Sequence, residues 1–274
     1  YYAPGLYAET FKHVANCTTC ASVNTRANQI PVQNFELPPT PMHSIAIDTC
    51  GSFPTSHLGN KYVVTIVDLF TGYAEAHITM DKSTATVADL LVNDFFIRHL
   101  IPRNLLSDNG TEYLNEVIKY ITSTLRIHHI KASAYNPRAN GKCERSHRLL
   151  TDTLVKLSQK DPASWDTYVK NYVGAYNCAA TSSGFSPFFL LYHRLPCYPL
   201  DTLLRPRDNY KGENFGIHLI EKMHKIFVQL RKQLQAEQSK RNTKINKTAK
   251  TDKLQVGDAV YVRNNARENK LSTR

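Results

Sequence analysis

Three acidic residues of this chain, Asp48, Asp108 and Glu144, have the types and the spacing for two-metal chemistry. Asp48 lies inside a strand-like run, where an ionised carboxylate is unfavourable unless a metal ion or hydrogen bonds compensate it. Asp108 begins the turn signal Asp-Asn-Gly after a short apolar run, and 35 residues separate it from Glu144. Carboxylates that converge from such positions can hold two divalent cations about 3.5–4 Å apart, which suits an in-line displacement at phosphorus. Mg²⁺ fits an all-oxygen ligand set of this kind.

Glu144 lies near the start of an expected helix over residues 141–157, in which Leu150, Leu154 and Leu157 recur at helical spacing. Arg148 follows Glu144 by one helical turn. A carboxylate and a guanidinium so placed could hold a metal ion and a phosphate together. They could equally be an ordinary surface pair, which stabilises a helix by a few tenths of a kcal/mol.

The elements that must position these acids alternate between strands and helices. We expect three strands as a meander, then a helix, a strand, a second helix and a further strand before the helix of Glu144. This order predicts an α/β domain. The expected strands cover 43–53, 61–68, 72–80, 104–107 and 126–130, and the expected helices cover 83–100, 112–124, 141–157, 161–180, 186–192 and 217–234.

The charge balance of the chain points to an anionic partner. The net charge is +11 and the pI is near 9.3, which favours nucleic acid, although a merely basic soluble protein would show the same balance. No apolar run reaches the length of a membrane span, so we expect no membrane partner. The first residues are not a signal peptide, and without an initiator Met we expect the chain to begin inside a longer polyprotein or to be a fragment.

Cys17 and Cys20 form a C-x-x-C pair, whose two thiolates can chelate one tetrahedral Zn²⁺. A complete site needs two more ligands, which we expect upstream of Tyr1, and His13 is a conceivable third ligand. The same spacing also suits a redox pair or two unpaired thiols. Towards the other end, lysines and Arg241 form a basic stretch up to residue 253, which is either a solvated helix end or a contact for a phosphate backbone.

The ordered motifs resemble one family. Asp48, Asp108 within Ser-Asp-Asn-Gly, and Glu144 within Asn-Gly-Lys-Cys-Glu-Arg look like the D,D-35-E signature of retroviral and long-terminal-repeat retrotransposon integrases. Residues 1–20 resemble the second half of the integrase His-His-Cys-Cys zinc module. Residues 183–196 are similar to the segment that follows the core in gypsy-type elements, and residues 256–262 resemble the start of the C-terminal small barrel.

The resemblance implies an RNase H-like core, a mixed sheet flanked by helices. It would carry a truncated N-terminal zinc-binding helical module and the start of a C-terminal β-barrel. The implied domains are the half zinc module at 1–36, a proline-rich linker at 37–42, the catalytic core at 43–200, a helical basic linker at 201–253 and the truncated β-module at 254–274.

The family also implies the activity, which is divalent-metal-dependent 3′-end processing and strand transfer of retroelement DNA into target DNA. Asp48, Asp108 and Glu144 would hold two Mg²⁺ or Mn²⁺ ions, and Cys17 and Cys20 would contribute half of a Zn²⁺ site. The implied partners are the element's terminal DNA, the target DNA and further copies of the chain, as a tetramer or larger. The enzyme would be made in the cytoplasm within a polyprotein and would act in the nucleus. The implied DNA contacts are Tyr135, Asn136, Arg138, Asn140, Lys142 and Arg148.

Two residues depart from the family pattern, and two alternative functions were considered beside the integrase. Family members commonly carry Gln where Arg138 stands, and the family does not use the position of His13 for zinc. A domesticated or decayed copy would bind DNA or protein without catalysis. A ribonuclease on the same core would need a fourth acid, and the sequence shows none at a matching place. The remaining acids considered are expected to be surface or capping groups: Asp68, Glu75, Asp81 and Glu112.

Overall fold

The computed structural model describes residues 4–17, 36–131, 141–197 and 214–247, except for the side chains of residues 15–16 and 141–146. The chain divides into two compact units, one formed by residues 35–235 and the other by residues 1–34 and 236–274. In chain order the elements are α1 Leu6–Asn16, β1 Ser44–Gly51, β2 Tyr62–Asp68, β3 Ala74–Thr79, α3 Thr84–Asp89, the π-helix η1 Leu90–Phe95, α4 Phe96–His99, β4 Asn104–Ser107, α5 Glu116–Thr124, β5 His128–Lys131, α6 Gly141–Leu157, the 3₁₀-helix η3 Pro162–Ser164, α7 Asp166–Cys178, α8 Pro187–Tyr192 and α10 Phe215–Asn246.

The unit of residues 35–235 is built on one mixed five-stranded sheet in the order β3-β2-β1-β4-β5. The first three strands form an antiparallel meander, whereas β1, β4 and β5 run parallel to one another. The meander follows from short turns between the strands, and the parallel pairs require helical crossovers. The carboxyl ends of β1, β4 and β5 therefore meet at one edge of the sheet.

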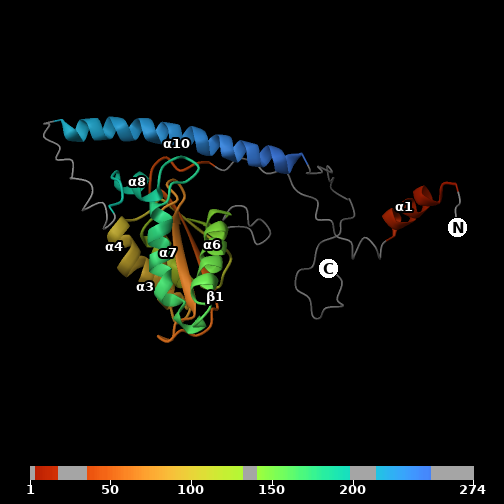
Figure 1. Ribbon diagram of the computed structural model, residues 1–274, viewed down its shortest axis with the longest axis horizontal. Helices are drawn as coiled ribbons and strands as arrows, with labels where there is room; N and C mark the ends of the chain where they lie inside the picture. Colours follow the sequence, from red (N-terminus) through yellow and green to blue (C-terminus); the bar gives the residue numbers. More distant parts are fainter. Residues whose placement is uncertain (1–3, 18–35, 132–140, 198–213, 248–274) are drawn as a thin grey trace. The chain divides into compact units, whose positions relative to one another are not determined.

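Helices cover both faces of this sheet (Figure 1). On one face, Ile45 and Ile47 of β1 pack with residues of α3, η1, α4 and α5 in the largest apolar cluster. On the other face, Val63 of β2 is clustered with Leu150 of α6 and Val169 of α7. Because successive strand residues point to opposite faces, the even-numbered residues of β1, including Asp48, face α6 and α7.

The structure confirms the predicted α/β order, with local differences. The expected helix 83–100 contains the π-helical turn η1, and α5 begins at Glu116 rather than at residue 112 because the Asn115 side chain caps Ile118 N at 3.0 Å. Of the three leucines at helical spacing, Leu150 and Leu154 are buried, whereas Leu157 is 48% exposed at the end of α6. The expected strand within residues 254–263 lies outside the described residues.

A further apolar cluster joins the end of the meander to helices α8 and α10. Phe70 packs with Leu190 of α8 and with Met223, Ile226 and Leu230 of α10. The helix α10 begins at Phe215 and ends at Asn246, so it is longer than the predicted 217–234. Since its first turns take part in this cluster, residues up to 235 belong to the unit that contains the sheet.

Trp165 is the single tryptophan of the chain, and it lies in the core at 2% exposure. Its ring stacks on Phe53 with centroids 4.7 Å apart, and Nε1 donates a hydrogen bond of 2.7 Å to the Pro54 carbonyl. A buried indole N–H needs such a partner. The contact ties the start of α7 to the loop after β1, so the fluorescence of Trp165 reports on the core.

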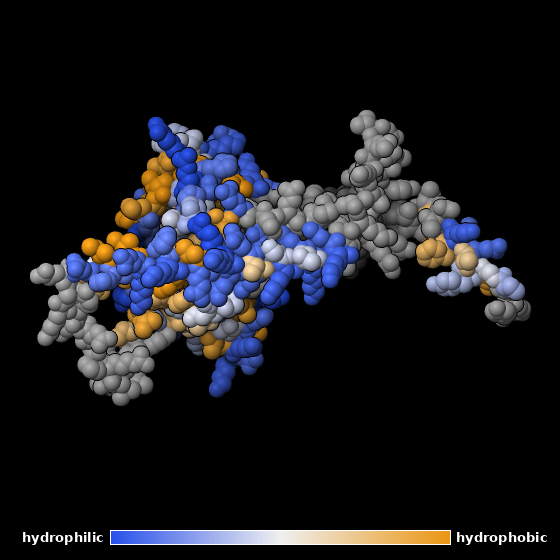
Figure 2. Space-filling view, turned by 90° about the horizontal axis from the view of Figure 1, so that it is seen from above, coloured by the Kyte–Doolittle hydropathy of each residue, from blue (hydrophilic) through white to orange (hydrophobic). Residues whose placement is uncertain are grey.

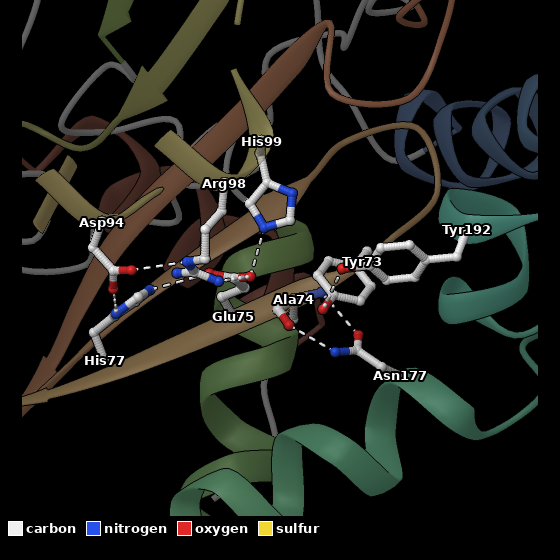
Figure 3. A network of polar contacts seen from close by, with 9 residues as sticks. All are labelled: Tyr73, Ala74, Glu75, His77, Asp94, Arg98, His99, Asn177 and Tyr192. Atoms are coloured by element: carbon white, nitrogen blue, oxygen red, sulfur yellow. Dashed lines mark hydrogen bonds and ion pairs between the residues drawn. The ribbon is translucent and has the colours of Figure 1, made fainter. Parts of the chain in front are cut away.

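The edge strand β3 carries a buried carboxylate, Glu75, in a polar network (Figure 3). Arg98 of α4 donates two hydrogen bonds of 2.7 Å to it, and His99 Nε2 lies 2.7 Å from Oε1. Asp94 of η1 accepts a hydrogen bond from Arg98 and contacts His77 on β3. Burial alone would raise the pKa of Glu75, but hydrogen bonds from His77, His99 and Arg98 outweigh it and hold the pKa well below its usual value.

The acids that were expected to be surface or capping groups divide into two kinds. Asp81 is exposed and accepts hydrogen bonds before α3, as expected, and Asp68 caps the turn after β2 although it is 1% exposed. For Glu75 and Glu112 the expectation was wrong, because both are buried. Their burial depends on partners distant in sequence, Arg98 and Lys82, which no local pattern reveals.

The surface seen in Figure 2 is mostly hydrophilic, with groups of apolar residues between the polar ones. Exposed apolar side chains include Ile97, Leu100 and Ile101 at the end of α4 and beyond it. Within the part of the chain that the structure describes, no helix has both the length and the apolar character that crossing a membrane requires.

Candidate active site

The parallel pairing of β1 with β4 brings Asp48 and Asp108 together. Ala46 is in register with Leu106, and each aspartate lies two residues further along its strand direction. Adjacent strands lie about 4.8 Å apart, and residues two apart on a strand point to the same face. Both aspartates therefore lie at the same edge of the sheet, Asp48 within β1 and Asp108 directly after β4. Consistent with this, both charges help burial to raise the pKa of the Tyr113 hydroxyl.

Backbone hydrogen bonds orient both carboxylates. Asp48 Oδ1 accepts a bond of 2.9 Å from its neighbour Thr49 N, and Asp108 Oδ1 accepts a bond of 2.8 Å from Gly110 N. The Asp48 side chain is 15% exposed, whereas Asp108 lies at the surface. A partly buried and a solvent-facing carboxylate at one edge form a site that a ligand can reach.

Helix α6 crosses β1 and β2 beside Asp48. His147 Nδ1 lies 3.3 Å from Asp48 Oδ2, and its Nε2 makes a short hydrogen bond with the Thr65 hydroxyl. One turn further along α6, the Thr151 hydroxyl lies 3.7 Å from Cys50 Sγ on β1. These contacts fix the rotation of α6 about its axis relative to β1.

Glu144 lies in the first turn of α6, three residues before His147. Residues three apart share one face of a helix, so the backbone position of Glu144 is on the face that His147 presents to Asp48. The side chain of Glu144 is outside the described part. Among the described side chains, no group of three or more His, Cys, Asp or Glu residues has the arrangement of a metal site. The triad with Glu144 therefore remains a prediction.

His147 and Tyr113 were not identified from the sequence. Burial lowers the pKa of His147 to about 4, although the negative charge of Asp108 acts in the opposite direction and raises it. The imidazole is therefore neutral at neutral pH, and it can orient Asp48 through hydrogen bonding. The Tyr113 hydroxyl bonds the Thr49 hydroxyl and so links β1 to the segment after Asp108. The spacing of His147 from Glu144 could have indicated the first contact, whereas nothing in a single sequence pairs Tyr113 with Thr49.

The other predicted site residues are placed only in part. Arg148 is exposed on α6, and Lys142 lies in the first turn of α6 with its side chain not described. Cys17 directly follows α1, in which His13 is exposed. The remaining predicted residues lie outside the described ranges: Cys20, Tyr135, Asn136, Arg138 and Asn140.

The donor set at the sheet edge fits a hard divalent cation. Asp48 and Asp108 supply carboxylate oxygens, and such oxygens are the ligands that Mg²⁺ prefers. Among the described side chains, none that is cationic forms an ion pair with Asp108, and His147 is neutral beside Asp48. Two adjacent carboxylates repel one another without a cation between them, which favours such binding.

Comparison with known proteins agrees with this geometry. Residues 38–137 match the integrase core domain family. The chain is 27% identical over 237 residues to the retrovirus-related Pol polyprotein from transposon 412 of Drosophila melanogaster, which covers 85% of this chain and 19% of that protein. It is 26% identical over 208 residues to the Gag-Pol polyprotein of avian reticuloendotheliosis virus, which covers 72% of this chain and 17% of that protein.

Among solved structures, a chain of the simian T-cell lymphotropic virus intasome in complex with PP2A regulatory subunit B56 gamma matches with a TM-score of 0.53 at 19% identity, over 75% of this chain and 72% of that one. At that identity the likeness concerns the fold, which is RNase H-like. The chain thus carries an integrase core domain. It resembles the integrases of retroviruses and long-terminal-repeat retrotransposons, and it spans about a fifth or less of the length of the polyproteins it matches.

Proposed function

We propose that this chain is a polynucleotidyl transferase, the integrase of a gypsy-type element or a close retroviral relative. It would catalyse 3′-end processing and strand transfer of the element's DNA into target DNA. The observation that carries the proposal is the register of β1 and β4: Asp48 and Asp108 each lie two residues beyond the paired Ala46 and Leu106, Asp108 directly after β4, and His147 of α6 contacts Asp48. The match to the integrase core domain supports it.

In this proposal each residue at the sheet edge has a defined task. Asp48, Asp108 and Glu144 hold two Mg²⁺ or Mn²⁺ ions, which when bound activate the attacking oxygen and stabilise the leaving one. The N–H groups of Thr49 and Gly110 orient the two aspartates, and the neutral imidazole of His147 supports Asp48. Water is the first nucleophile at the DNA end, and the freed 3′-hydroxyl is the second at a target phosphate.

The partners and modules of the proposal follow the family resemblance and the net charge of +11. The basic chain binds terminal and target DNA and works as a homo-oligomer of four or more copies. The DNA contacts in this proposal are Tyr135, Asn136, Arg138, Asn140, Lys142 and Arg148. Cys17 and Cys20 supply half of a zinc site in the module of residues 1–36, and residues 43–200 form the catalytic core. Since its relatives are Pol and Gag-Pol polyproteins, we infer synthesis within a polyprotein and action in the nucleus.

A strand-transfer assay tests the proposal. The full chain is incubated with Mg²⁺, a plasmid target and duplex oligonucleotides that carry the element's terminal sequence. We expect joining by the wild type, and no joining by the variants Asp48→Asn, Asp108→Asn and Glu144→Gln, with Trp165 fluorescence and DNA binding unchanged. Asp152→Asn, an exposed carboxylate on α6, is the matched control that retains activity.

Three results would contradict the proposal. Joining by purified Glu144→Gln would remove Glu144 from the site. DNA binding by the wild type without any metal-dependent joining would favour the alternative of a decayed or domesticated copy. Hydrolysis of RNA in a hybrid, without joining of DNA, would favour a ribonuclease.

A further inference from the structure

Glu112 has a buried carboxylate that is only partly compensated. Its side chain is 6% exposed, and Lys82 Nζ approaches Oε1 at 3.5 Å, which is long for a hydrogen bond. Oε2 is buried and has no hydrogen-bond partner among the described residues. An oxygen that has lost water without gaining a donor is unfavourable, and such a group in a native structure often marks a site for an ion or a water.

Glu112 lies beside Asp108. A Cβ added to Gly110 would be 2.7 Å from Glu112 Oε2 and 3.0 Å from Asp108 Oδ1, so both oxygens border the same small space, which glycine leaves open. Both charges also contribute to the raised pKa of Tyr113. The unpartnered oxygen of Glu112 is therefore directed at the end of β4 where Asp108 stands.

A structural role accounts for only part of this arrangement. Capping of α5 is done by Asn115, whose Oδ1 accepts from Ile118 N, so Glu112 is not needed for it. The ion pair with Lys82 accounts for Oε1, but Lys82 is 50% exposed and approaches only that oxygen. Neither role explains why Oε2 is buried next to another carboxylate.

We propose that Glu112 is a positioning residue that supports the binding of a divalent cation by Asp108 without ligating the cation itself. Its charge adds to the negative potential at Asp108, whose Oδ1 borders the same small space as Glu112 Oε2. Lys82 opposes the effect by neutralising part of the Glu112 charge. The inference rests on the metal site of the proposed function and adds a supporting residue outside the set of ligands.

Mn²⁺ binding to the full chain, followed by the electron paramagnetic resonance signal of unbound Mn²⁺, tests the proposal without DNA or turnover. Residues that support metal ligands typically change metal affinity by about 10–100-fold, so we expect Glu112→Gln to weaken Mn²⁺ binding by about tenfold. Glu116→Gln removes the same charge from an exposed position four residues later and should leave binding unchanged. Lys82→Gln should strengthen binding several-fold.

A second readout separates this role from a purely structural one. If Glu112 acts through cation binding, Glu112→Gln raises the Mg²⁺ concentration needed for half-maximal strand transfer but reaches the wild-type rate at saturating Mg²⁺. A lower maximal rate with unchanged Mg²⁺ dependence would contradict the inference.

Reference variants distinguish failure of this inference from failure of the proposed function. If Asp108→Asn loses Mn²⁺ binding while Glu112→Gln binds like the wild type, the role of Glu112 is overturned and the active site stands. If Asp108→Asn binds Mn²⁺ like the wild type, the proposed metal site is overturned and this inference with it. If Trp165 fluorescence shows that Glu112→Gln is unfolded, Lys82→Gln decides: tighter Mn²⁺ binding supports the inference, and unchanged binding overturns it.

Discussion

Replacing Glu75 with Gln tests whether the buried network between β3 and α4 stabilises the core. The substitution keeps the shape of the side chain but removes its charge, so both hydrogen bonds from Arg98 lose their anionic acceptor. An amide also presents its own N–H₂ group to the donors of Arg98 or His99, which leaves at least one donor without an acceptor.

The magnitude follows from burial and geometry. Removing one partner of a fully buried ion pair costs about 3–5 kcal/mol, because the remaining charge is left without compensation. The Glu75 side chain is 10% exposed, but that of Arg98 is 44% exposed and can be hydrated after the change. We therefore expect Glu75→Gln to lower the free energy of unfolding by about 2–3 kcal/mol.

The effect should depend on pH in one direction. The pKa of Glu75 is held below its unfolded-state value of about 4.3, so the carboxylate stabilises the fold above that pH, and the contribution is lost as the pH falls below it. The difference between wild type and Glu75→Gln should be constant from pH 7 to about pH 5 and should shrink at lower pH, since glutamine does not titrate.

Urea unfolding of the full chain, followed by Trp165 fluorescence, measures this difference. The control is Glu116→Gln, which removes a surface carboxylate that is 87% exposed and paired with Lys119, and it should change stability by less than about 0.5 kcal/mol. A loss for Glu75→Gln no larger than that of the control, or a loss that does not diminish in acid, would refute the reasoning.

Three further predictions concern the site and its support. His147→Ala removes the contact with Asp48 Oδ2 and should lower the strand-transfer rate by about tenfold, with Trp165 fluorescence unchanged; an unchanged rate would remove His147 from the site. Gly110→Ala places a methyl group against the oxygens of Glu112 and Asp108 and should weaken Mn²⁺ binding, measured by electron paramagnetic resonance. An affinity equal to that of the wild type would show that the loop adjusts without disturbing the site. Trp165→Phe loses the hydrogen bond to the Pro54 carbonyl and should lower the free energy of unfolding by about 1–3 kcal/mol. Urea unfolding followed by circular dichroism measures this change, and an unchanged free energy would show that water replaces the indole N–H.

The strands and most helices could be predicted because their signals are local. The run from Lys61 to Asp68 is β-branched and aromatic, and the repeat of leucines after Gly141 has helical spacing, so β2 and α6 were found with their limits nearly correct. The start of α5 was predicted too early, at residue 112, because the Asn115 side chain caps the helix and α5 begins at Glu116.

Asp48 and Asp108 could be selected from the sequence because an acid inside a strand is unfavourable without a partner, and because both acids, with Glu144, fit the spacing of the integrase signature. The side chains that contact them could not be selected in this way. The roles of His147, Thr65 and Glu112 depend on contacts between residues far apart in the chain, which form only when the domain folds. Such contacts have no signature in the order of residues alone.

The π-helical turn η1 between α3 and α4 fixes where Arg98 and His99 point. A wider turn accommodates one residue more than an α-helical turn would, so it acts as an insertion within the helix. If the same residues wound as a regular α-helix without the wide turn, everything after it would be rotated by about 100° about the helix axis. Arg98 and His99 would then turn away from Glu75, so their contact with the edge strand β3 depends on the wide turn.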